Sequence, residues 1–115
     1  MRAHRKLWVD ALRSGKYQQT QGYLHTKSGF CCLGVACDVY QAEVGDLTVA
    51  CLYNNIISYD SYTAYLPSKV KNWLGLTTSF GDYNARSLAL DNDTGLTFAV
   101  IANLIESEVN GLVNV

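Results

Sequence analysis

The sequence predicts a single α+β domain over residues 1–115, with a small antiparallel sheet and four to five short helices. Two observations predict this class. Residues 17–24 alternate with the two-residue period of a strand, and from Cys32 onward the apolar residues recur at helical spacing. Hydrophobic residues make up 49% of the chain and proline occurs once, a composition that excludes a disordered protein.

The N-terminal part of the chain is predicted to form a helix and then a hairpin. Residues 4–14 are expected to be helical, because their apolar residues recur every three or four positions and Gly15 can end the helix. Residues 17–24 are predicted as the first strand of the hairpin, residues 26–29 as its turn and residues 30–31 as its return strand.

A second helix is predicted to begin at Cys32. This helix is apolar on nearly every side, because Val35 and Val39 lie on the face opposite the other apolar residues that recur from Cys32 at helical spacing. A helix of this kind is buried, so we expect the other elements to pack around it. Four cysteines lie in or near this helix: Cys31, Cys32, Cys37 and Cys51. We expect them to be reduced, buried side chains rather than zinc ligands, because no CxxC pair is present.

The rest of the chain is predicted to alternate between short strands and short helices. Residues 47–53 and 56–59 are rich in β-formers and are joined by a turn at residues 54–55. Pro67 opens a short helix that Gly75 closes. Five further segments are predicted: a strand over residues 77–83 broken at Gly81, a helix over residues 86–90, a turn over residues 91–95, a final helix capped by Thr97 and ended by Gly111, and a closing strand over residues 112–115.

Positive charge is concentrated near the start of the chain, although the net charge is only −1. Residues 1–27 hold six of the nine Lys and Arg residues and one of the ten Asp and Glu residues. A basic helix face paired with acidic neighbours explains this distribution, and so does a local anion site. The overall basic excess is too small to predict binding to duplex DNA.

One set of side chains suits a nucleotide ligand. Tyr17, Gln19, Gln21 and Tyr23 share one face of the predicted strand. The complete candidate set is Arg13, Lys16, Tyr17, Gln19, Gln21, Tyr23, Arg86 and Asn92. Aromatic rings, amides and a few cations are what a base, a ribose and a phosphate require. The alternative is an ordinary sheet surface that is solvated or covered by another subunit.

Several functional classes lack their signature residues. Neither His4 nor His25 has a nucleophile motif around it, and no phosphate-binding glycine loop is present. Residues 91–95 resemble a calcium loop, but no glutamate occupies the twelfth position. Residues 93–98 resemble the start of a helix-turn-helix module whose recognition helix is missing. We therefore expect no catalysis, metal or cofactor. No apolar run can span a bilayer or act as a signal peptide, so we expect an intracellular protein without a membrane partner.

Four motifs carry a resemblance that covers nearly the whole chain: GKYxQ…GYL, GFCCLGVACDVY, LPSKVKNWLGL and NDTGLTFAVIANLIE. They resemble a widespread group of small phage and prophage proteins, and this group is similar to the Thoeris anti-defence sponges. The resemblance implies a homo-oligomer in the host cytoplasm that sequesters a cyclic ADP-ribose-type signal or a cyclic oligonucleotide without cleaving it, with Asn92 as a ligand contact. The chain has only four arginines, which leaves the ligand class open.

Two rival functions remain open at this point. The chain could be a protein-binding inhibitor of a host nuclease or defence enzyme, acting through the tyrosine-rich residues 53–65. It could also be a small nucleotide hydrolase, which ranks last because no nucleophile, base and metal set is visible.

Overall fold

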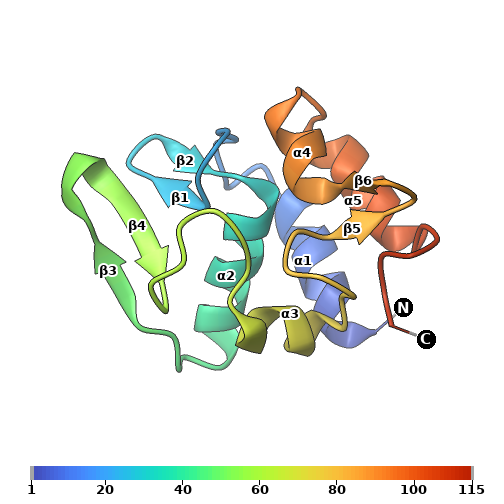
Figure 1. Cartoon of the computed structure of the whole chain (residues 1–115), viewed down its shortest axis with the longest axis horizontal. Helices are drawn as coiled ribbons and strands as arrows, with labels where there is room; N and C mark the ends of the chain where they lie inside the picture. Colours follow the sequence, from blue (N-terminus) through green and yellow to red (C-terminus); the bar gives the residue numbers. More distant parts are fainter. Residues whose placement is uncertain (1, 115) are drawn as a thin grey trace.

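A computed structural model describes residues 2–114 of the chain. Within them, four strands form an antiparallel sheet in the order β2–β1–β4–β3, and two more strands form a separate hairpin (Figure 1). The strands are β1 (His25–Thr26), β2 (Gly29–Phe30), β3 (Val49–Cys51), β4 (Ile56–Tyr59), β5 (Asp82–Tyr83) and β6 (Arg86–Ser87). The helices are α1 (Ala3–Arg13), α2 (Cys32–Glu43), α3 (Ser68–Leu74), α4 (Leu88–Asp93), α5 (Phe98–Glu106) and the 3₁₀ turn η1 (Tyr53–Asn55). The α+β class is confirmed.

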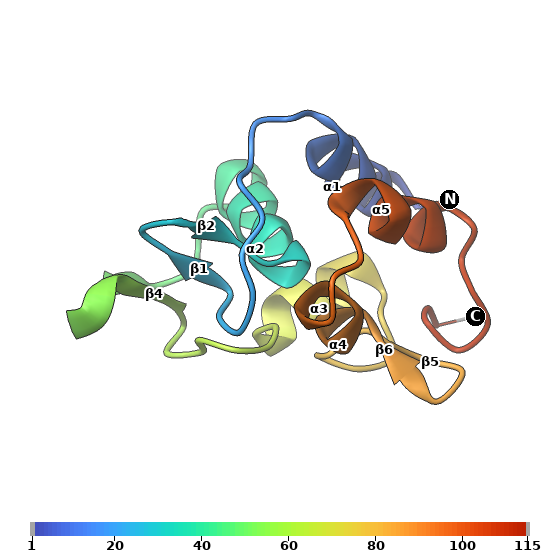
Figure 2. The same cartoon turned by 90° about the horizontal axis from the view of Figure 1, so that it is seen from above.

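Helix α2 lies at the centre, between the four-stranded sheet on one side and helices α1, α3 and α4 on the other (Figures 1 and 2). Eight of its 12 residues are buried, which confirms the predicted buried helix. Its start is fixed by the sulfur of Cys31, which accepts the N–H of Gly34. Trp8 of α1 donates its indole N–H to the carbonyl of Cys32 at 2.9 Å. A fully buried indole thus has a partner for its polar atom while its rings fill the core.

Helix α2 also passes very close to the segment that precedes the hairpin. A Cβ atom placed on Gly34 would lie 1.6 Å from the carbonyl oxygen of Leu24, so only glycine permits this approach. Leu24 itself is fully buried. The backbone just before the hairpin therefore packs directly against the central helix α2.

The hairpin is shorter than predicted. Its turn is narrower than predicted, because β1 pairs with β2 across Lys27 and Ser28 alone. The return strand is present but ends at Phe30, since Cys31 caps α2. The predicted strand over residues 17–24 is wrong, since this segment makes only an isolated bridge between Gln19 and Phe30. Two-residue β2 offers too little backbone for a longer ladder, and Gly22 turns the chain with a φ of 92°. The segment instead crosses the surface as a loop.

The second hairpin, β3–β4, agrees closely with the prediction. Asn54 and Asn55 form its turn with φ values of 72° and 61°, in the left-handed region that asparagine tolerates. Cys51 lies in β3 and is exposed, so the prediction that all four cysteines are buried is wrong for this residue. Its side chain projects from an end strand rather than into the core. The other three cysteines are buried, and burial raises the pKa of Cys31 to about 11.

The last third follows the prediction only in part. Helix α3 with Gly75 at its end, and the cap of α5 by Thr97, are both confirmed. Of the predicted strand over residues 77–83, only the two residues of β5 form a strand, so the prediction is wrong for the rest. Helix α4 starts later than predicted, because Ser87 caps it. Helix α5 ends at Glu106 rather than near Gly111, because the chain turns through Glu108 with a φ of 51°.

The predicted closing strand is reduced to one bridge between Leu76 and Val113, and Val115 lies outside the described residues. None of the helices within residues 2–114 combines the length and the apolar character needed to cross a membrane.

Candidate functional site

Gln19 and Asn92, two of the predicted ligand residues, lie together and form the Gln19–Asn92 network. The Gln19 Nε2 donates to Asn92 Oδ1 at 2.9 Å and to the carbonyl of Leu96 at 2.8 Å. The Gln19 Oε1 accepts the N–H of Phe98 at 3.1 Å, at the first turn of α5. One side chain therefore bridges α4 and α5 from the loop that follows α1.

Asn92 completes this network with its remaining hydrogen-bonding atoms. It is 0% exposed. Its Oδ1 accepts the N–H of Cys32 at 3.1 Å, and its Nδ2 donates to the carbonyl of Thr20 at 2.8 Å and to Asp93 at 3.3 Å. The side chains of Gln19 and Asn92 therefore join the loop, α2, α4 and α5. All of their amide hydrogens are used in these hydrogen bonds, so neither residue has a free amide hydrogen to donate to a ligand.

Tyr17 belongs to a second cluster, which also contains Phe30 and Asp38. Its hydroxyl donates to Asp38 of α2 at 2.6 Å, and its ring meets Phe30 edge-on with centroids 4.9 Å apart. Burial, and then the bond to Asp38, raises the pKa of Tyr17. The phenol is thus held protonated as a donor to the carboxylate.

His25 lies in the same cluster, stacked on Phe30 with ring centroids 3.7 Å apart. Its Nδ1 is 2.8 Å from the hydroxyl of Tyr59. Burial lowers the pKa of His25, while the nearby Asp38 carboxylate acts in the opposite direction. The sequence placed Tyr59 only in the tyrosine-rich region, residues 53–65, and placed Asp38 in no candidate site. The one available signal for Asp38 was its acidic side chain directly after the apolar first half of α2.

The two predicted phosphate-binding arginines are paired with acids. Arg13 donates to Glu106 at 3.0 and 3.1 Å and to Asn103 at 2.7 Å, and its hydrogen bond to Glu106 raises the pKa of Arg13 and lowers that of Glu106. Arg86 donates twice to one oxygen of Asp91, at 2.6 and 3.1 Å.

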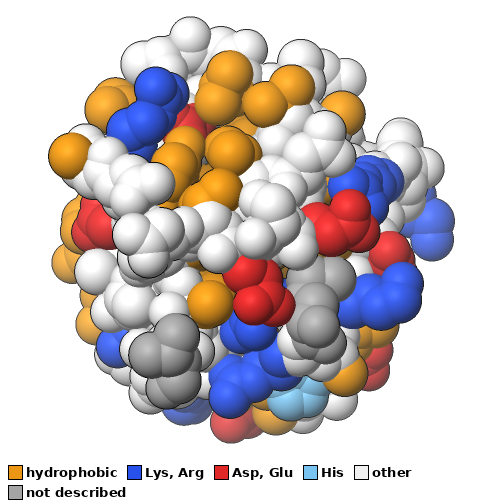
Figure 3. Space-filling view, turned by 90° about the vertical axis from the view of Figure 1, so that its right-hand side faces the viewer, with side chains coloured by type: hydrophobic (Ala, Val, Ile, Leu, Met, Phe, Trp, Pro, Cys, Tyr) orange, Lys and Arg blue, Asp and Glu red, His pale blue; other side chains and the backbone are white. Residues whose placement is uncertain are grey.

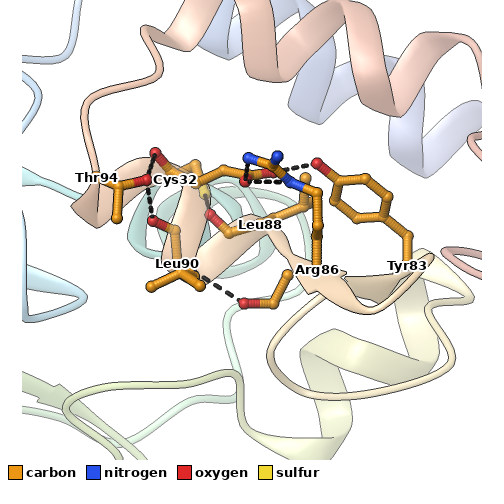
Figure 4. Close-up of polar contacts among 8 residues, drawn as sticks. Cys32, Tyr83, Arg86, Leu88, Leu90 and Thr94 are labelled. Carbon is orange, nitrogen blue, oxygen red and sulfur yellow. Dashed lines mark hydrogen bonds and ion pairs between the residues drawn. The ribbon is translucent and has the colours of Figure 1, made fainter.

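Asp91 is 1% exposed. The carboxylate oxygen that does not bind Arg86 accepts a hydrogen bond from the hydroxyl of Tyr83, and Tyr83 and Arg86 lie side by side in Figure 4. On the face seen in Figure 3, positive and negative side chains are interspersed. The basic residues of this face are therefore not gathered into a single positively charged patch.

The remaining three predicted residues are Lys16, Gln21 and Tyr23, and all three are exposed on the loop after α1. The backbone of this loop is held at Gly22, whose N–H donates to Asp93 at 2.9 Å. The structure thus brings the half-buried Gln19 and the fully buried Asn92 together and leaves these three side chains exposed. Tyr17, Arg13 and Arg86 each bind a different acidic residue.

The tyrosine-rich region divides into buried and exposed rings. Tyr53, at the tip of the β3–β4 hairpin, is 90% exposed, whereas Tyr59 in β4 is 2% exposed. Tyr62, Tyr65 and Phe80 form a separate group of rings. The ring centroids of Tyr62 and Tyr65 are 5.2 Å apart, and those of Tyr65 and Phe80 are 4.8 Å apart. Within the tyrosine-rich residues 53–65, the strongly exposed ring without a ring partner is therefore Tyr53, at the hairpin tip.

Strand β3 is the end strand of the four-stranded sheet (Figure 1). The N–H of Leu52 bonds to β4, and the carbonyl of Thr48 accepts the N–H of Asp60 just beyond β4. Backbone groups alternate in direction along an antiparallel strand, so those of Ala50 also face β4 and those of Val49 and Cys51 face outward. The strand is only three residues long, and it has neither a charged residue nor a proline, two of the features that protect an exposed edge.

Residues 2–114 contain no group of three or more His, Cys, Asp or Glu side chains arranged to hold a metal ion. Searches of the curated proteins and of solved structures found no significant match. A family profile described as a domain of unknown function, DUF8296, matches residues 1–109. Since the match spans nearly the whole sequence, the chain belongs to the DUF8296 family.

Proposed function

We propose that this protein acts by binding a partner protein, which adds an extended strand to the open edge of β3. The observation that carries the proposal is the uncharged edge itself, with the outward backbone groups of Val49 and Cys51. Leu52 and Tyr53 are exposed beside it and supply apolar contacts. In strand addition, main-chain hydrogen bonds provide affinity and flanking side chains provide specificity.

The class of partner is the one that the tyrosine-rich residues 53–65 suggest in the sequence. A protein of this kind would act as an anti-defence inhibitor, and its partner would be a host nuclease or another defence enzyme. The exposed hairpin tip supports this mode, because a ring that is 90% exposed is available to enter a pocket on the partner.

Nucleotide capture is the second candidate function. It is supported by Lys16, Gln21 and Tyr23, an exposed cation, amide and ring on one loop. In this form the proposal uses the loop surface and not the Gln19–Asn92 network, whose amides are occupied.

A pair of substitutions at one position tests the edge. We expect Cys51→Pro to weaken binding of an extended peptide at least about tenfold, because proline removes the outward N–H while the bonds of Ala50 to β4 remain. Cys51→Ser keeps the N–H and should bind like the wild type. The probe is a peptide selected from a random displayed library against the wild-type chain, with affinities measured by titration calorimetry.

Equal affinity of the two variants would contradict strand addition, provided that both melt within a few degrees of the wild type. Melting curves with cyclic ADP-ribose isomers and cyclic oligonucleotides form the second arm. A ligand-dependent rise in melting temperature that is identical in both variants would favour nucleotide capture. Self-association that disappears only in Cys51→Pro would identify a second copy as the strand donor.

A further inference from the structure

A groove lies at the C-terminal end of α2, and none of its lining residues belongs to the Gln19–Asn92 network, the Tyr17 cluster or the β3 edge. It has a volume of about 290 Å³ and is lined by His4, Leu7, Glu43, Val44 and Trp73. We refer to it as the α2-end groove. Its volume is at the low end for small-molecule pockets, so it fits one side chain or a small organic group rather than a large ligand.

Two of the residues that line the groove form a stacked aromatic pair. The rings of His4 and Trp73 stack with centroids 4.3 Å apart and planes within 15°. The His4 Nδ1 is 3.0 Å from the carbonyl oxygen of Trp73, and because a carbonyl can only accept, Nδ1 carries the hydrogen. In the neutral ring, Nε2 is therefore a hydrogen-bond acceptor. Leu7 and Val44 are exposed and give the groove apolar sides.

The charge at the groove is negative and uncompensated. Glu43 is the last residue of α2, where the unpaired carbonyls carry the negative end of the helix dipole. No basic residue occupies the last turn of α2. Within residues 2–114, the carboxylate of Glu43 forms no ion pair or hydrogen bond, in contrast to Glu106, which binds Arg13. An acid at this end of a helix is unfavourable unless a cation approaches it.

We propose that the α2-end groove binds a cationic side chain of a protein or peptide, with arginine as the best fit. The apolar stem would lie along Leu7 and Val44, and the guanidinium would meet the carboxylate of Glu43 and the stacked aromatic pair. A planar cation on an aliphatic stem suits both surfaces, because guanidinium packs on aromatic rings and pairs with carboxylates. This inference does not depend on strand addition at β3.

Butylguanidinium and its neutral analogue butylurea test the groove as matched probes. Titration of the wild-type chain, followed by two-dimensional NMR, should give saturable millimolar binding of butylguanidinium, with the largest shifts at His4, Val44 and Trp73. Butylurea should give no saturable shift. Glu43→Gln should weaken the binding about fivefold, whereas Asp82→Asn, which removes an exposed acid outside the groove, should leave it unchanged.

Two results would overturn the proposal. One is equal binding of the charged and the neutral probe, which would show an apolar groove without charge recognition. The other is an affinity for butylguanidinium that is the same in Glu43→Gln and in the wild type, which would place the cation elsewhere.

Discussion

Gly34→Ala is expected to unfold the protein or to leave it only marginally folded. The new Cβ would lie 1.6 Å from the Leu24 carbonyl oxygen and 2.5 Å from its carbonyl carbon, so both obstacles are backbone atoms. Helix α2 would have to move away from the segment before the hairpin, and this would open the core around it. We expect a loss of about 4 kcal/mol or more, a large share of the stability of a small domain.

Circular dichroism and chemical unfolding measure this loss, with Gly15→Ala as the matched control. Gly15 has a φ of 76°, and no atom lies within 4 Å of the position that a Cβ would take there. Alanine at this position therefore meets only backbone strain of about 1–2 kcal/mol. If Gly34→Ala costs no more than Gly15→Ala, the close approach of α2 to Leu24 is refuted.

Asn92→Asp is expected to produce the second largest loss. The change keeps the shape of the side chain but replaces the donor to the Thr20 carbonyl with an acceptor. It also places a carboxylate at a fully buried position next to Asp93. An unpaired buried acceptor together with a buried charge should cost about 3–5 kcal/mol.

Asn103→Asp, which changes an exposed asparagine, provides the control for this substitution. Its oxygen accepts a hydrogen bond from Arg13, so a carboxylate there keeps the contact and should change the stability by less than about 1 kcal/mol. Chemical unfolding of both variants at neutral pH decides the matter. If Asn92 served mainly as a ligand contact, Asn92→Asp would melt near the wild-type temperature.

The elements that could be predicted from the sequence are those determined by nearby residues. The buried helix from Cys32 follows from its apolar pattern, and the turn at Asn54 and Asn55 follows from residues that tolerate a left-handed backbone. Thr97 caps α5 through a bond to Val100, only three positions away. Local sequence contains all the information that these elements require.

The loop after α1 could not be predicted, because its structure depends on distant contacts. The alternation of residues 17–24 is real, but Gln19 points to the start of α5 and binds the N–H of Phe98, 79 positions later. Asn92 likewise reaches Cys32 across 60 positions. Amides that look available to a ligand in the sequence are therefore recognised as structural only when the segments are seen together.

Residue-by-residue hydrogen exchange of the free protein tests the central claim most directly. That claim is that the amides of the Gln19–Asn92 network hold the fold together, whereas the open edge of β3 is the binding surface. We predict strong protection for the N–H groups of Cys32 and Phe98, and little for those of Val49 and Cys51. Fast exchange at Cys32 and Phe98 combined with slow exchange at Val49 and Cys51 would contradict it.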